Sequence, residues 1–302
     1  MTMDSLTVVI PTYNRSAVLK KALDAYRMQS APQLIGELIV VDDGSTDGTE
    51  AMVLETSRES SFPIRYLRQS NKGPAAARNV GIREAISELI LFTDDDIIPG
   101  PTLVAEHVEW HNKSPESSTA VLGYVTWAPE VKPTPFMNWY GSDGPLFAYA
   151  RFEGRTELDY KYFYTCNLSL NAEFLRRNGT FDEDFKVAAW EDMELGYRLA
   201  KSGMRLLYNP KALAYHQQYV SFEDACRRSK KASAAAEVFG QKEAGTYFHS
   251  RQQACAPSPG KQRFRAQILK WAGLILAPLK SFMDWKVPLP WSVYRIMFRV
   301  FH

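Results

Sequence analysis

Cysteine is scarce in this sequence, which excludes the sites and scaffolds that depend on it. Only three cysteines occur among the 302 residues, at positions 166, 226 and 255, with no CxxC pair and no zinc-type spacing. A reducing compartment, the cytoplasm, is therefore expected. A large net charge is lacking too. The 36 basic residues stand against 34 acidic ones, a balance that disfavours a nucleic-acid-binding protein.

Long hydrophobic runs are also missing. The N-terminus has no positively charged segment and reaches Pro11 after a short apolar run, a pattern that is not typical of a signal peptide. The longest uncharged apolar run, 271–279, falls well short of the ~18 residues that a membrane span needs. No GxGxxG motif follows the first predicted strand, which disfavours a dehydrogenase. The remaining composition, 45% hydrophobic and 23% charged, is typical of a globular chain.

Predicted strands and helices alternate along the first hundred residues. The strands are short apolar runs, many of them β-branched, at 6–10, 37–41, 64–68 and 89–93. The helices between them carry apolar residues at helical spacing, at 16–29, at 49–58 and in a third segment that ends at residue 86. Four such units with continuous apolar strands predict an α/β fold, a mostly parallel sheet with helices on both faces.

Mostly polar residues gather where these predicted strands end. They are Pro11, Thr12, Tyr13 and Asn14 after the first strand, Asp42 and Asp43 after the second, and Asp94, Asp95 and Asp96 after the fourth. Ligands of such sheets bind beyond the carboxyl ends of the strands. Five carboxylates at one edge repel one another, so a divalent cation or a cationic ligand group is expected there.

Four motifs then give the sequence a family resemblance. They are PTYNR at 11–15, VVDDGSTDGT at 40–49, FTDDDIIPGP at 92–101 and WEDMELGYRLAKSG at 190–203. Over residues 5–220 the chain resembles glycosyltransferase family 2, the inverting nucleotide-sugar transferases with the GT-A fold. The resemblance implies a GT-A catalytic domain over 1–220. It also implies metal-dependent transfer of a sugar, with inversion, from a nucleotide-diphosphate donor to a hydroxyl of a glycan or lipid-linked acceptor, as in polysaccharide biosynthesis. A UDP-sugar is the expected donor.

The resemblance also implies where the nucleotide binds. The residues expected to contact it are Pro11, Thr12, Tyr13, Asp42, Asp43, Arg78, Asp94 and Asp95. Asp42 or Asp43 would accept a hydrogen bond from the nucleobase, and Arg78 would approach the nucleotide. The alternatives are that both aspartates only form the turn before Gly44 and that Arg78 is a solvated cation at the start of a helix.

The spacing of Asp94 and Asp96 fits a DxD motif. Two carboxylates so placed lie on one side of the chain and can share a hard cation such as Mg²⁺ or Mn²⁺. The resemblance implies that Asp96 ligates the metal and that Asp94 or Asp95 contacts the ribose or the water shell of the metal. His216 would complete the metal site, with a structural histidine as the alternative.

The acceptor side is expected near Glu191 and Asp192, at the start of a predicted helix over 190–202. The resemblance places the catalytic carboxylates there. Asp192 is the expected general base, which takes a proton from the acceptor hydroxyl as that hydroxyl attacks the anomeric carbon. Glu191 is a second catalytic candidate, with stabilisation of the helix N-terminus as the alternative for both.

Two further features have two interpretations each. No regular structure is expected over 123–144, where Trp127, Trp139 and Tyr140 could stack on a sugar or pack in the core. His107 and His111 have the spacing of metal ligands on a helix but no HExxH pattern, so a solvated helix face is expected.

The C-terminal region, 221–302, is expected to be a helical, basic appendage. From 261 to 302 there are eight lysines and arginines against one acid, and apolar residues recur at helical spacing over 264–275 and 291–301. Such helices suit an anionic membrane surface, which would make the protein peripheral at the inner face of the membrane. The alternative is an appendage packed on the catalytic domain or on a partner.

Two other functions compete with the transferase. A phosphatase-like hydrolase would need a nucleophilic aspartate where Pro11 follows the first strand. A protein of a polysaccharide assembly that binds sugar nucleotides without turnover would not need Asp94, Asp96 and Asp192, so their presence disfavours it without removing it.

Overall fold

The computed structural model describes residues 5–254, 276–286 and 288–301. Nine strands form one sheet in the order β3-β2-β1-β4-β8-β6-β9-β5, with β7 paired to β9. Their bounds are β1 (Leu6–Thr12), β2 (Ile35–Asp42), β3 (Ile64–Arg68), β4 (Leu89–Thr93), β5 (Ile97–Pro99), β6 (Thr119–Trp127), β7 (Glu157–Leu158), β8 (Asn167–Asn171) and β9 (Arg205–His216).

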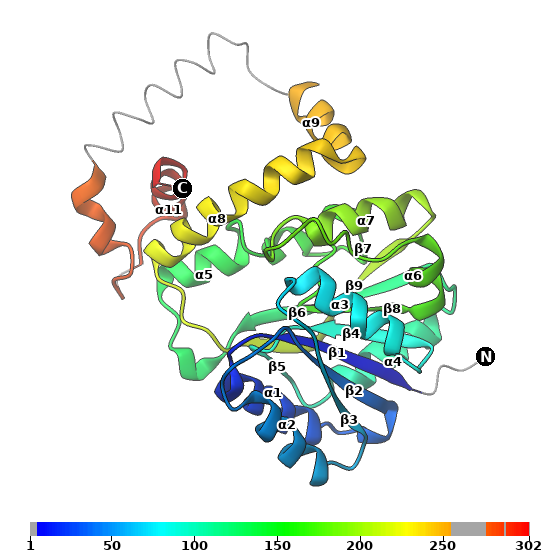
Figure 1. The fold of residues 1–302 in the computed structure, drawn as a ribbon. Coiled ribbons are helices and arrows are strands. Elements are labelled where there is room, and N and C mark those ends of the chain that lie inside the picture. Colours follow the sequence, from blue (N-terminus) through cyan, green and yellow to red (C-terminus); the bar gives the residue numbers. More distant parts are fainter. Residues whose placement is uncertain (1–4, 255–275, 287, 302) are drawn as a thin grey trace.

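Helices cover both faces of this sheet, with α1 and α2 on one side and α3 on the other (Figure 1). The α-helices are α1 (Ser16–Arg27), α2 (Thr49–Arg58), α3 (Pro74–Glu84), α4 (Leu103–Lys113), α5 (Pro135–Ser142), α6 (Ala172–Asn178), α7 (Glu191–Lys201), α8 (Phe222–Gln241), α9 (Glu243–Ala254) and α11 (Trp291–Phe301). Short 3-10 turns are η1 (Pro32–Leu34), η2 (Pro129–Val131), η3 (Tyr149–Phe152), η4 (Tyr160–Tyr162) and η5 (Ala277–Phe282).

The α/β prediction is confirmed, and the first four strands of the sheet order form a parallel group. There β3, β2, β1 and β4 are parallel, because each is reached by a helical crossover. The second half is mixed: β8 runs antiparallel to both neighbours, β4 and β6, while β6 and β9 are parallel. The strands β1, β2 and β4 are almost wholly buried, as their continuous apolar sequences require.

The segment 123–144, expected to be irregular, is largely regular. Strand β6 continues to Trp127, and α5 begins at Pro135. Proline is tolerated in the first turn of a helix, and the side chain of Thr134 caps this one by accepting a hydrogen bond from the backbone N–H of Met137. Trp139 in α5 is 2% exposed, so it packs in the core.

The helices beyond residue 220 pack on the rest of the chain. Phe239 of α8 joins a hydrophobic cluster with Tyr197 of α7. Tyr294, Met297 and Phe298 of α11 are buried against α5 and α8. For 291–301 the packed appendage is therefore the arrangement observed, whereas the stretch 264–275 lies outside the described residues. In the part of the chain that is described, no helix is long and apolar enough to cross a membrane.

His107 and His111 do not form a solvated face, and that expectation was wrong. Both side chains of α4 are fully buried against β8. Nδ1 of His107 and Nε2 of His111 each lie 2.8 Å from the Ser169 hydroxyl, and Nε2 of His107 lies 2.8 Å from Oδ1 of Asn167. Burial lowers the pKa of His107 to about 4 and that of His111 to about 3, so both imidazoles are neutral at pH 7.

This pair predicts loss of stability in acid. The unfolded chain takes up protons near pH 6.5, but the folded chain does so only near pH 4 and below, so the free energy of unfolding falls as the pH drops through this window. The slope is up to about 1.4 kcal/mol per pH unit for each histidine. Urea unfolding at pH 7 and pH 5 should show a smaller fall for His111→Gln than for wild type. An unchanged fall in His111→Gln would contradict the assignment, and His249→Gln, an exposed site, is the control.

Candidate active site

The site is built where the segment that follows β4 meets the end of β9. A turn follows β4, in which the Asp94 carbonyl accepts a hydrogen bond from the backbone N–H of Ile97. The next strand, β5, pairs with the end of β9 and sets Ile97 opposite His216. The three aspartates after β4 and the histidine that ends β9 are therefore neighbours, although about 120 residues separate them in sequence.

Asp95 and Asp96 share one cationic partner, Arg15. Its guanidinium lies 2.8 Å from Oδ1 of Asp95 and 2.8 Å from Oδ2 of Asp96. The Thr12 hydroxyl donates to the other oxygen of Asp95. Burial raises the pKa of Asp95 to about 7, against the opposing effect of Arg15. The sequence reading missed Arg15 as a partner of the acids, although it closes the PTYNR motif.

Asp96 also faces His216. Nε2 of His216 lies 3.8 Å from Oδ2 of Asp96, and both side chains are nearly buried. Burial lowers the pKa of His216, so its imidazole is neutral at pH 7 and keeps a lone pair for a ligand. Arg15 is then the charged partner of Asp96. Nδ1 of His216 is buried and has no hydrogen-bonding partner among the described residues.

Arg78 joins the DxD segment to the start of α7. Its side chain is 3% exposed, and its two terminal nitrogens lie 2.7 Å from Oδ1 of Asp94 and 3.2 Å from Oε1 of Glu191. Burial alone would lower the pKa of Arg78, but Asp94, Asp192 and Glu191 outweigh it. The alternative of a solvated cation was wrong. A fixed positive charge stands between two acidic motifs about 100 residues apart in sequence.

Glu191 and Asp192 have different surroundings in the first turn of α7. Glu191 is 3% exposed and is held by Arg78. Asp192 is half-buried, and its carboxylate accepts hydrogen bonds from the backbone N–H and the hydroxyl of Thr165. Burial raises the pKa of both carboxyls. The charge of Asp192 raises the pKa of Glu191 further, and the charge of Asp94 adds to the raised pKa of Asp192. Of the two, Asp192 is the one that solvent or a ligand can reach.

The residue before this pair, Trp190, has an unusual backbone. Its φ of 72° lies in the left-handed region, which costs energy for a residue with a side chain. The indole packs on Phe239 of α8 and Phe248 of α9, with ring centroids 4.9 and 6.1 Å away, and its N–H donates to the Ala232 carbonyl. Helices α8 and α9 thus contact the residue that directly precedes α7.

Asp42 and Asp43 are both tied into the loops around them. Asp42 accepts hydrogen bonds from the Ser45 backbone N–H and the Tyr66 hydroxyl. Asp43 accepts them from the Gln69 side chain and from the backbone N–H groups of Lys72 and Gly73. The bond from Ser45 to Asp42 belongs to the turn named as the alternative, whereas Asp43 joins that turn to the loop after β3. These contacts leave few free acceptor positions on either carboxylate. In contrast, Tyr13 is 46% exposed at the same edge of the sheet.

Comparisons with known proteins identify the family of this chain. A family model described as glycosyl transferase family 2 matches residues 7–161, about half of the chain. Validoxylamine A glucosyltransferase from Streptomyces hygroscopicus subsp. jinggangensis is 35% identical over 223 residues, which cover 66% of this chain and 52% of that protein. The chain therefore spans about half the length of this curated relative.

Two solved structures share the fold. A TarS fragment from S. aureus has a TM-score of 0.59 at 17% identity and covers 98% of this chain and 89% of its own. The mannosyltransferase PcManGT from Pyrobaculum calidifontis, in complex with GDP-Man and Mn²⁺, has a TM-score of 0.56 at 21% identity, with 98% and 86% covered. At these identities the similarity establishes the fold, which is GT-A.

Proposed function

The chain belongs to glycosyltransferase family 2, and from this we propose that it is an inverting glycosyltransferase that uses a nucleotide-diphosphate sugar. The observation that carries the proposal is the ion-paired Arg78, which contacts Asp94 on the donor side and Glu191 on the acceptor side. A donor and an acceptor must meet within a few ångströms for transfer to occur. Contacts through one buried arginine bring the two halves of such a site together.

The donor is proposed to lie at the ends of β1, β2 and β4. Tyr13 is exposed there and can contact a base, while Asp42 and Asp43 shape the loops beside it. The similar structures were solved with different nucleotides, UDP for TarS and GDP-Man for PcManGT. UDP is the nucleotide that we propose, and titration with nucleotides of different bases tests this choice.

The residues at the DxD turn fit a divalent cation that is shared with the substrate. Among the described residues, no group of three or more His, Cys, Asp or Glu could hold a metal ion alone. Asp96 and the neutral His216 supply two donors side by side, and Asp94 adds a partly exposed carboxylate for the water shell. Mg²⁺ and Mn²⁺ commonly take one or two carboxylates and complete their shell with phosphate oxygens and water. When bound, the cation would supply positive charge to the leaving diphosphate.

The chemistry of the chain itself rests on Asp192. We propose that its carboxylate takes the proton of the acceptor hydroxyl, while the Thr165 contacts fix its orientation. The raised pKa makes Asp192 a stronger base than an ordinary aspartate. Glu191 is proposed to act beside it by holding Arg78 in place. Attack from the side opposite the diphosphate would give inversion.

Calorimetric titration tests the donor site. UDP, GDP and dTDP are titrated into the protein with Mn²⁺ and then with excess chelator. We expect one nucleotide to bind only with the metal, and Asp96→Ala to weaken that binding at least tenfold because one metal donor is lost. Glu55→Ala, at an exposed position on α2, is the matched control. Equal binding by Asp96→Ala and wild type would contradict the metal assignment.

The alternative is a sugar-nucleotide-binding protein without turnover. Such a protein would have the same donor site as the transferase but would not transfer the sugar. A phosphate-coupled assay measures the release of nucleotide diphosphate from a sugar nucleotide in the presence of candidate acceptors. Such release distinguishes a transferase from a protein that only binds. Metal-dependent binding with no turnover in any arm would favour the non-catalytic role.

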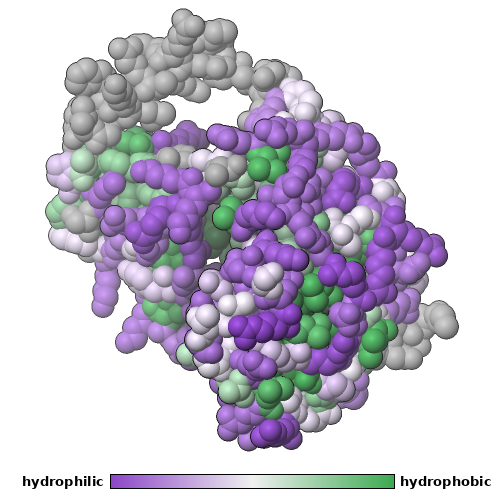
Figure 2. Space-filling model, in the orientation of Figure 1, coloured by the Kyte–Doolittle hydropathy of each residue, from purple (hydrophilic) through white to green (hydrophobic). Residues whose placement is uncertain are grey.

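We also propose that the C-terminal region attaches to an anionic membrane on its inner face. The residues proposed to contact the membrane have exposed side chains and do not lie on the buried face of α11. They are Leu279, Phe282, Trp285 and Ile296. Hydrophobic side chains gather at the edge where Figure 1 places η5, beside hydrophilic ones (Figure 2). Lys280, Lys286, Arg295 and Arg299 supply the positive charge that anionic lipids attract.

Vesicle sedimentation tests this attachment. With vesicles of phosphatidylglycerol and phosphatidylcholine, the double variant Phe282→Asp/Trp285→Asp should sediment several-fold less than wild type, since it removes apolar area and adds repulsion. Met28→Asp/Leu54→Asp changes two exposed hydrophobic residues on α2 and next to α1, and should sediment like wild type. Equal sedimentation of all three proteins would favour the packed appendage alone.

A further inference from the structure

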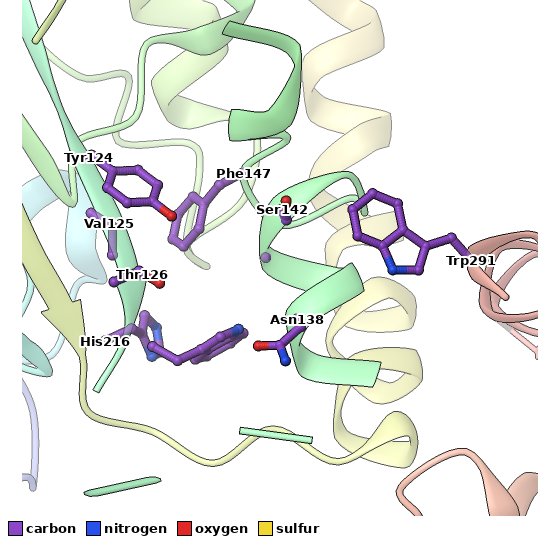
Figure 3. Close-up of a pocket in the computed structure, with 10 residues that line it drawn as sticks. Tyr124, Val125, Thr126, Asn138, Ser142, Phe147, His216 and Trp291 are labelled. Atoms are coloured by element: carbon purple, nitrogen blue, oxygen red, sulfur yellow. The ribbon is translucent and has the colours of Figure 1, made fainter. Parts of the chain in front are cut away.

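A pocket of about 230 Å³ opens between the end of β6, helix α5 and helix α11 (Figure 3). The side chains that give it its character are Tyr124, Trp127, Asn138, Ser142, Phe147 and Trp291. His216 also lines it. None of the nucleotide contacts proposed above lies in this lining, so the pocket is separate from the donor site. Of the lining residues, His216 alone also belongs to the proposed metal site, where its Nε2 faces Asp96.

Aromatic rings form much of the lining. The indole of Trp127 meets the His216 ring edge-to-face at 5.2 Å, and Phe147 lies 6.4 Å from the same ring. Figure 3 shows Tyr124 and Phe147 next to each other on one side and Trp291 on the other. Such rings offer flat apolar surfaces, which suit the C–H faces of a sugar ring.

Polar groups without protein partners lie among these rings. The Thr126 and Ser142 hydroxyls and the Asn138 amide make no hydrogen bond to any described residue. A buried ring nitrogen, Nδ1 of His216, also lacks a partner in that part of the chain. Aromatic faces combined with free hydroxyl and amide groups match a ligand with apolar faces and a hydroxylated edge, which is the chemistry of a pyranose. The volume is below the roughly 300–1,000 Å³ of pockets for drug-sized ligands and suits one ring.

Trp291 reaches the pocket from the C-terminal helix. It is 45% exposed, so packing of α11 does not require it. The helix is anchored next to the pocket by Tyr294, Met297 and Phe298. Arg295 adds an ion pair to Asp143, the residue that directly follows Ser142. The position of Trp291 beside α5 is thereby fixed.

We propose that this pocket binds a pyranose unit of the acceptor and that α11, through Trp291, is part of the acceptor site. The proposal rests on the proposed transferase function for the identity of the ligand as acceptor. Through His216 the pocket adjoins Asp96, so a sugar held there lies next to the donor site. The C-terminal helix then contributes to substrate choice, beyond the segment that the family model matches.

Saturation-transfer NMR with methyl glycosides of glucose, galactose, mannose and N-acetylglucosamine tests the pocket. At least one glycoside should bind the wild-type protein. Trp291→Ala should weaken that binding about threefold to tenfold, since it removes one stacking face. Ser142→Trp, which places a large side chain in the pocket, should abolish it. Trp285→Ala is the matched control, because Trp285 is 54% exposed in the same region and does not line the pocket.

Thermal unfolding of each variant confirms that it is folded, and calorimetry with the nucleotide should give wild-type affinity throughout. Absence of binding by every glycoside overturns the inference, as does an equal loss in Trp285→Ala and Trp291→Ala. Nucleotide binding without glycoside binding would overturn the acceptor pocket alone. Glycoside binding lost in Trp291→Ala, in a protein that binds no nucleotide, would support a sugar pocket and remove the transferase.

Discussion

Asp192→Asn is expected to lower kcat for sugar transfer by about 10²–10⁴-fold, the range that general-base catalysis supplies. The change is isosteric and removes the proton acceptor. An asparagine oxygen can still accept one of the two Thr165 hydrogen bonds, so the start of α7 should keep its position. Nucleotide affinity should stay within about twofold, because the base contacts the acceptor and not the donor.

The measurement is release of nucleotide diphosphate under saturating donor and acceptor, with calorimetry in parallel. Asp184→Asn is the control, since it makes the same chemical change at an exposed loop position. A kcat near the wild-type value in Asp192→Asn would remove Asp192 from the role of base. Loss of nucleotide binding together with turnover would point to a disturbed fold around Arg78 instead.

Arg78→Met is expected to lower the free energy of unfolding by about 3–5 kcal/mol, the cost of removing one partner from a buried ion pair. Methionine fills similar space but leaves Glu191, itself 3% exposed, without a counter-charge. Asp94 loses the same partner. The two carboxylates then repel each other and Asp192 in a site with little water. Nucleotide affinity should fall as well, because the DxD turn loses its anchor.

Urea unfolding measures the first effect, with Arg177→Met as the matched control. Arg177 is 75% exposed and pairs with Glu173 one helical turn away, so its removal should cost about 0.3–0.5 kcal/mol. The double variant Arg78→Met/Asp94→Asn should be less destabilised than the sum of the two single changes. A cost for Arg78→Met no larger than that for Arg177→Met would contradict the electrostatic account.

The sequence predicts the parallel half of the sheet well because its signals are local. Each of β1, β2 and β4 is a run of buried apolar residues that ends in a polar turn, and a helix-spaced segment follows. The motifs then set the acids at one edge. The antiparallel placement of β8 could not be read, because its partners β4 and β6 are chosen by contacts between distant segments.

The sequence does not show which polar residues are buried. His107 looked like a surface residue because its partners, Asn167 and Ser169, lie about 60 residues further along the chain. The ion pair of Arg78 with Glu191 was hidden for the same reason, since Glu191 is more than 100 residues away. A charged or polar residue is buried only when such a partner exists, and one sequence does not show the pairing.

The C-terminal helix exposes a different ambiguity. An amphipathic pattern over 291–301 is compatible with binding to a membrane surface and with packing on a protein surface, since either surface can contact one apolar face of a helix. The structure resolves it for Tyr294, Met297 and Phe298, which are covered by α5 and α8. Trp291 and Ile296 lie outside that face and remain exposed.

The left-handed backbone of Trp190 implies that heat inactivation would depend on helices α8 and α9. Contacts from α8 and α9 hold this residue at a φ of 72°, and Glu191 and Asp192 follow it directly. If α8 and α9 detach, Trp190 is released to an ordinary conformation and the first turn of α7 shifts, while the nine-stranded sheet can stay intact. Activity would then be lost at a lower temperature than the sheet. In that case the thermal limit of the proposed activity would be set by helices that lie outside the segment matched by the family model.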